Sequence, residues 1–198
     1  MKENLSQENF DLVISADKSF GDAARELLEY RELFYILAWR DFKVRYKQTV
    51  IGALWALLRP LLTMVVFTVI FGKIAGLPSP GDAPYAVMVF TAMLPWYFFS
   101  SSFQEGSNAL VANANMISKV YFPRIIVPVS SLFVNSIDFL ISAGVLALIM
   151  VFYQFSPSEN IIYLPLFVII LALFTVGLSL WMSALNVQYR DVRYVVPF

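Results

Sequence analysis

Two charged residues lie inside long hydrophobic runs of this sequence, where a charge needs a specific reason to be. Arg59 is about nine residues into the first run, and Asp138 is about 13 residues into the third. An unpaired charge at the centre of a bilayer costs on the order of 2.5–3.5 kcal/mol, so each side chain should face protein or a wet cavity. The two could form an ion pair between the runs. Alternatively, Arg59 reaches the lipid headgroups, and Asp138 pairs with a nearby polar group such as Asn135.

A cluster of aromatic residues near the end of the second hydrophobic run is the next candidate. Trp96, Tyr97 and Phe98 are consecutive, and aromatic residues make up 16% of the chain. Such rings often form a belt at the membrane surface. Because flat ring faces also stack on sugar rings, the same residues could line a path for a carbohydrate.

Polar segments between the hydrophobic runs could bind another protein. The segment 104–124 is long for a plain connection between two helices, and a short helix over 107–120 fits its sequence. It ends in Lys119 and Arg124, around a Tyr-Phe-Pro break. The tail 188–198 has a similar character. A docking surface on each segment is therefore a reasonable expectation.

Four hydrophobic runs must position these side chains. They cover about 50–71, 84–103, 125–153 and 161–187, and each approaches or exceeds the ~20 residues that a membrane-crossing helix needs. The alternation typical of a β-barrel is absent. The sequence therefore predicts an all-α, polytopic membrane protein.

A polar lead-in (1–22) and an amphipathic helix (23–49) are predicted to precede the first run. Apolar residues recur in the helix at steps of three and four residues. Its basic and aromatic residues suit a lipid surface, although a helix packed on another protein would show the same pattern. These interface-helix candidates are Trp39, Arg40, Lys43, Arg45 and Lys47.

The charges and the missing residue types narrow the function. The chain of 198 residues is 59% hydrophobic and 14% charged, which excludes an ordinary soluble domain. A cytoplasmic N-terminus would place 12 of the 14 Lys and Arg residues on the cytoplasmic side, as the positive-inside rule favours. The formal net charge is zero, so no basic field attracts nucleic acid. The sequence contains no His and no Cys, so it has no metal site built from these ligands and no catalytic histidine. No cofactor is expected in this chain. It also has no Walker A motif, so ATP-driven work would need another subunit.

Four segments, taken together and in order, resemble the permease subunit of bacterial type-2 ABC exporters for O-antigen, teichoic acid or capsular polysaccharide. They are WRDFKVRYKQTVIGALWALLRPLLTMVVF (39–67), MLPWYFF (93–99), NANMISKVYFPRIIVPVSS (113–131) and LSLWMSALNVQYRDVRYVVPF (178–198). The resemblance implies a homodimer in the bacterial inner membrane, with two copies of a separate ATPase that binds ATP and magnesium. It also implies a lipid-linked glycan as the substrate and a role in guiding the sugar for Trp96, Tyr97 and Phe98.

The resemblance further implies that two cytoplasmic segments couple the permease to the ATPase. The residues at the matching positions are Asn113, Asn115, Lys119, Tyr121, Arg124, Tyr189, Arg190 and Asp191. Members of this family have six spans, so two more are expected beyond the four in this sequence. Two other classes stay open, namely an integral-membrane enzyme and a non-catalytic membrane scaffold of envelope-glycan assembly. An enzyme would lack parts, because Asp138 is the only carboxylate inside a hydrophobic run.

Overall fold

The computed structural model describes residues 29–47, 52–79, 81, 83–189 and 191–196, and every regular element in these ranges is a helix. The predicted all-α fold class is confirmed. The predicted lead-in over 1–22 lies outside the described residues, as does the start of the predicted interface helix. The elements are α2 (Arg31–Lys47), α3 (Gly52–Phe67), η1 (Thr68–Ile74), α4 (Tyr85–Ala112), α5 (Ala114–Ile117), α6 (Ile126–Phe152), η2 (Glu159–Tyr163), α7 (Leu164–Gln188) and α8 (Val192–Val195).

Four helical segments are long and apolar enough to cross a membrane, as the four hydrophobic runs predicted. They cover Leu57–Ile74, Tyr85–Ala112, Ile126–Phe152 and Glu159–Gln188. Large apolar side chains remain exposed along them, such as Leu148 on α6 and Phe167 and Leu173 on α7. Surfaces this apolar are stable in lipid rather than in water. The chain is therefore a multi-pass membrane protein.

Helix α4 is longer than the sequence predicted. The second hydrophobic run was expected to end near residue 103, but the helix continues to Ala112. The short helix predicted over 107–120 is wrong, because 107–112 belong to α4 and only Ala114–Ile117 form a separate turn of helix. Gly106, Ser107 and Ala109 are buried, so packing rather than hydropathy extends the helix.

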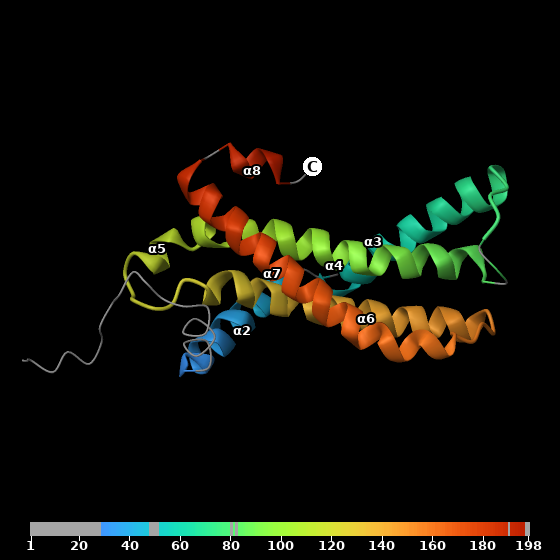
Figure 1. Ribbon diagram of the computed structural model, residues 1–198, viewed down its shortest axis with the longest axis horizontal. Coiled ribbons are helices and arrows are strands. Elements are labelled where there is room, and N and C mark those ends of the chain that lie inside the picture. Colours follow the sequence, from blue (N-terminus) through green and yellow to red (C-terminus); the bar gives the residue numbers. More distant parts are fainter. Residues whose placement is uncertain (1–28, 48–51, 80, 82, 190, 197–198) are drawn as a thin grey trace, which may run out of the picture.

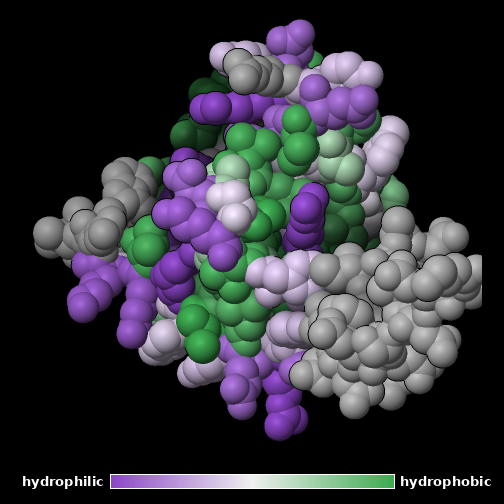
Figure 2. Space-filling view, turned by 90° about the vertical axis from the view of Figure 1, so that its left-hand side faces the viewer, coloured by the Kyte–Doolittle hydropathy of each residue, from purple (hydrophilic) through white to green (hydrophobic). Residues whose placement is uncertain are grey.

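Consecutive spans alternate in direction, so α4 packs against α6, which runs antiparallel to it, and against α7, which runs parallel to it. In Figure 1, α2, α5 and α8 lie together at one end of the bundle, and the connections 75–84 and 153–163 lie at the other. We call the first of these the α2 end. Figure 2 looks onto this end and shows hydrophilic side chains gathered around a hydrophobic interior.

Small residues let α4 and α7 approach closely. A Cβ atom added at Gly106 of α4 would lie 2.8 Å from the Cβ atom of Ser179 on α7, closer than two such atoms can pack. About two turns after Ser179 on α7, the Asn186 side chain donates hydrogen bonds to the Ser107 carbonyl and to Asn108 Oδ1 of α4, each at 3.0 Å. Small residues and interhelical hydrogen bonds are the usual means of holding membrane helices together.

Replacing Gly106 with alanine is expected to destabilise the bundle by about 1–2 kcal/mol, because α4 and α7 must move apart to admit the methyl group. Gly144→Ala in α6 is the matched control, since a Cβ atom there would meet nothing within 4 Å. Apparent melting temperatures of the two purified variants in detergent provide the measurement. Equal melting temperatures would show that the seam between α4 and α7 is not closely packed.

Helix α2 packs against the rest of the chain through one face. Leu37 is 3% exposed and lies in a core cluster with Ala109 of α4, Phe122, and Ile126 and Val127 of α6. The rest of its surface exposes Ile36 and other large side chains. The sequence allowed a helix on lipid or a helix packed on protein. The structure gives α2 a protein-facing side within the chain itself and leaves an apolar side for the membrane surface.

Candidate functional site

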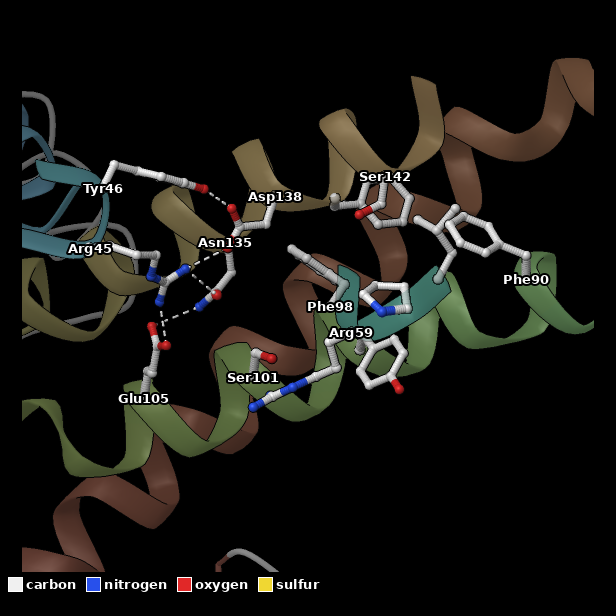
Figure 3. A pocket seen from close by; sticks show the side chains of 14 residues that line it. Arg45, Tyr46, Arg59, Phe90, Phe98, Ser101, Glu105, Asn135, Asp138 and Ser142 are labelled. Carbon is white, nitrogen blue, oxygen red and sulfur yellow. Dashed lines mark hydrogen bonds and ion pairs between the residues drawn. The ribbon is translucent and has the colours of Figure 1, made fainter. Parts of the chain in front are cut away.

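A cavity of about 370 Å³ opens between α2, α3, α4 and α6. Its wall combines aromatic rings with four charged side chains, and Figure 3 shows it from close by. The residues that line it are Arg45, Tyr46, Arg59, Pro60, Phe90, Leu94, Tyr97, Phe98, Ser101, Glu105, Asn135, Asp138, Phe139 and Ser142. The volume is at the lower end of the range for small-molecule sites in proteins.

Arg45 is the centre of a polar cluster that joins α2 to α4 and α6. One guanidinium nitrogen, Nη1, donates to Asp138 Oδ2 at 2.6 Å and to Asn135 Oδ1 at 2.9 Å. The other, Nη2, donates to Glu105 Oε1. Figure 3 shows Arg45 pointing from α2 toward these three side chains. A single side chain therefore ties three helices together.

The two carboxylates of this cluster have a donor for each of their oxygens. Besides the two bonds from Arg45, Tyr46 Oη donates to Asp138 Oδ1, and Asn135 Nδ2 donates to Glu105 Oε2 at 3.0 Å. Such a network satisfies charges that would be costly in an apolar bundle. The cluster keeps a formal charge of −1, since one cation faces two carboxylates.

Both sequence-based interpretations of Asp138 missed its main partner. No ion pair between Arg59 and Asp138 occurs among the described residues, where Asp138 pairs with Arg45 instead. The alternative, a polar neighbour such as Asn135, is present only as a member of the network around Arg45. The prediction failed because α2 folds back onto α6 and brings Arg45 to a residue 93 positions away.

Arg59 lies on the other side of the cavity, on α3. Its backbone carbonyl accepts a hydrogen bond from Thr63 Oγ1 at 2.8 Å, and its side chain is exposed. Figure 3 draws no interaction between its guanidinium and the other cavity residues. It lies seven residues after the start of α3 at Gly52, in the half of the span that is nearer α2.

The predicted aromatic candidates separate into two groups. Tyr97 and Phe98 line the cavity, where Tyr97 Oη donates to Thr63 Oγ1 at 3.0 Å and the Phe98 ring packs edge-on against Phe139 at 5.4 Å. Trp96 is not a lining residue, and it is 62% exposed. Successive helix residues point about 100° apart, so three in a row cannot all face one cavity.

The interface-helix candidates also differ in their surroundings. Arg40 donates to Asn113 Oδ1 at 2.9 Å and forms an ion pair with Asp41 at 2.7 Å, which links α2 to the junction of α4 and α5. Lys43 is exposed and lies 5.3 Å from the Trp39 ring centre, and Lys47 is exposed. Of the predicted set, Arg45 alone lines the cavity.

The predicted coupling residues gather at the α2 end. Asn113 ends α4 and precedes α5, and its backbone NH bonds the Ala109 carbonyl. Tyr121 is 52% exposed and Tyr189 is 56% exposed. Those with exposed side chains are Asn115, Lys119, Tyr121, Arg124, Tyr189 and Asp191. Arg190 lies outside the described residues. Exposed side chains at this end are accessible to a partner, and Figure 2 shows a largely hydrophilic surface there.

Sequence reasoning missed several cavity residues. Glu105 was assigned to a loop, and Tyr46, Phe90 and Phe139 were not singled out, although each lines the cavity. Helix periodicity could have found Glu105, which follows Phe98 by seven residues and so shares its face. The same periodicity could have found Phe139, which follows Asn135 by four residues and so lies on the helix face that carries Asp138.

Fold and site define the class, a multi-pass helical membrane protein with an internal polar cavity and a polar face at one end. Comparison with known proteins makes this specific. The chain belongs to the family described as ABC-2 type transporter, whose sequence profile matches residues 32–198.

Its relatives include permeases for polysaccharides. It is 31% identical over 172 residues to the O-antigen export system permease protein RfbA of Myxococcus xanthus, covering 87% of this chain and 65% of that protein. A protein of the same name from Klebsiella pneumoniae is 32% identical over 83% of this chain and 63% of its own length. The polysialic acid transport protein KpsM of Escherichia coli is 23% identical, over 80% of this chain and 61% of that protein. The chain thus spans less than two thirds of the length of these relatives.

Proposed function

We propose that this chain is part of the permease subunit of an ABC transporter that exports a lipid-linked polysaccharide of the O-antigen type across the bacterial inner membrane. The observation that carries the proposal is the family match over residues 32–198, together with relatives named as O-antigen export permeases at 31–32% identity. The permease works as a homodimer with two copies of a separate ATPase, and ATP and magnesium bind to that ATPase. The chain is a transport component and not an enzyme.

The charge distribution supports an orientation with the α2 end in the cytoplasm. Lys43, Lys47, Lys119 and Arg124 are exposed at this end. The opposite end carries Lys73 as its one Lys or Arg among the residues described there. Positive charge is retained on the cytoplasmic side of membrane proteins. The ATPase would then contact α5 and the segment around α8.

Complementation tests the function. The full gene is deleted from its host, and surface polysaccharide is examined with and without the restored gene. We expect surface glycan to disappear in the deletion strain, and a tagged permease to copurify an ATPase with a Walker A motif. Unchanged surface glycan, or repeated purification without any ATPase, would contradict the proposal. Turnover of an activated sugar by the purified protein would support an enzyme instead.

Replacing Asp191 with alanine is expected to lower ATPase stimulation by the assembled transporter several-fold, while the amount of permease in the membrane stays the same. Asp191 is exposed at the start of α8, outside the spans, so its loss should not disturb insertion. Glu159→Ala is the matched control, because this acidic residue is exposed at the opposite end, at the start of η2. Equal ATPase rates in the two variants would show that Asp191 does not contribute to the contact with the ATPase.

A further inference from the structure

Arg59 is the cavity residue whose charge has no protein partner among the described contacts. It lines the same cavity as Arg45, but the ion pairs and side-chain hydrogen bonds of the described residues do not involve its guanidinium. An arginine in the membrane usually pairs with a carboxylate, a backbone carbonyl or a lipid headgroup. The partner of Arg59 is therefore to be sought outside these contacts.

The nearby carboxylates are already engaged. Glu105 and Asp138 have four oxygens between them, and each oxygen receives a hydrogen bond from Arg45, Tyr46 or Asn135. Moving Arg59 to either carboxylate would compete with bonds that hold α2 in place. The formal charges of the four charged residues that line the cavity sum to zero. Among the described lining residues, Arg59 is the cation that remains available to a ligand.

Depth and shape point to the chemistry of that ligand. Arg59 lies seven residues after the start of α3, in the first half of its span, and its long side chain can extend toward the level of headgroup phosphates. Ser101 lines the same cavity and provides a hydroxyl donor, while Phe98 and Phe139 provide an apolar wall. A guanidinium next to an apolar wall suits a molecule with an anionic group at one end and a hydrocarbon chain at the other. Arginine is well matched to phosphate, because its fork of donors bonds two oxygens at once.

We propose that Arg59 binds the phosphate group of a lipid in this cavity, with the hydrocarbon chain against Phe98 and Phe139. The phosphate could belong to an ordinary membrane phospholipid or to the lipid that carries the exported glycan. The second source rests on the proposed function, but phosphate binding itself does not. Tyr97 holds the wall in position through its hydrogen bond to Thr63.

Binding is measured on the purified full-length permease in a sugar-based detergent, which contains no phosphate. The probes are phosphatidylglycerol, a short prenyl diphosphate and inorganic diphosphate. Arg59→Gln is expected to weaken the lipid probes about 10- to 100-fold, as expected for a charge-assisted bond removed from an apolar site. Arg59→Lys keeps the charge but loses the fork of donors, so it should weaken the lipid probes less than Arg59→Gln does. Lys73→Gln is the control, a cation at the other end of the same span that should leave binding unchanged.

The pattern across probes distinguishes the sources. Arg59-dependent binding that is tighter for phosphatidylglycerol assigns the site to membrane phospholipid, and tighter binding of the prenyl diphosphate assigns it to a carrier lipid. If inorganic diphosphate also binds in an Arg59-dependent way, Arg59 recognises the phosphate group even without the hydrocarbon chain, which supports the proposal. The proposal is overturned if Arg59→Gln, folded by size-exclusion chromatography, binds every probe as the wild type does, or if Lys73→Gln weakens binding equally. Unchanged surface glycan in the deletion strain would remove the proposed function and leave this binding result standing.

Discussion

Replacing Arg45 with methionine is expected to destabilise the helix bundle by about 2–3 kcal/mol. Methionine keeps an unbranched apolar stem but leaves Glu105 and Asp138 without their cation. Removing one partner of a buried ion pair lowers the stability of a protein by on the order of 3–5 kcal/mol. The loss is smaller here because the side chains of these ion pairs are 24–41% exposed. The apparent melting temperature of the purified protein and its amount in the membrane are the measurements.

Two further variants test whether the loss comes from unpaired charge. Lys43→Met removes a cation from the exposed face of the same helix, two residues earlier, and should change stability by less than about 0.5 kcal/mol. Adding Glu105→Gln and Asp138→Asn to Arg45→Met removes the stranded carboxylates and should restore part of the stability. If the triple variant is as unstable as Arg45→Met, the packing of the Arg45 side chain and not its charge holds α2.

The class of fold could be predicted because hydropathy decides it. Runs of about 20 apolar residues form helices in lipid whatever their neighbours are, and all four were found this way. The end of α4 could not be predicted from hydropathy, because the apolar run is interrupted by residues 104–109, which are polar or small. Gly106 and Ser107 are helical there since α7 packs against them.

The candidate site was only partly predictable, because its charge pairs depend on tertiary packing. Asp138 stood out as a charge in an apolar run, but its partner lies 93 residues earlier on a helix that the sequence assigned to a surface. A periodicity signal for that partner does exist. Arg45 follows Ala38 by seven residues, so the two share a helix face, and Ala38 is 3% exposed. Arg40 and Lys43 lie on other faces and remain exposed.

Replacing Leu37 with alanine is expected to destabilise the contact between α2 and the bundle by about 2–4 kcal/mol. Leu37 is 3% exposed and packs with Ala109, Ile126 and Val127, so alanine leaves a cavity in that cluster. Hydrogen exchange by mass spectrometry is the measurement, and faster exchange is expected over 31–47 than in the wild type, with α7 unchanged. ATPase stimulation should fall as well, because Arg40 links α2 to Asn113 at the junction of α4 and α5.

Ile36→Ala is the matched control, and it also decides which surface holds α2. Ile36 is adjacent to Leu37 on the helix but 61% exposed, on the side left for the membrane surface. If protein packing holds α2, Leu37→Ala speeds exchange over 31–47 and Ile36→Ala does not. If lipid holds α2, the order reverses in nanodiscs, because Ile36 would then bury its apolar surface in the bilayer interface. We expect Leu37→Ala to have the larger effect on exchange, since the Arg45 cluster and the Leu37 contacts both hold α2 against the rest of the chain.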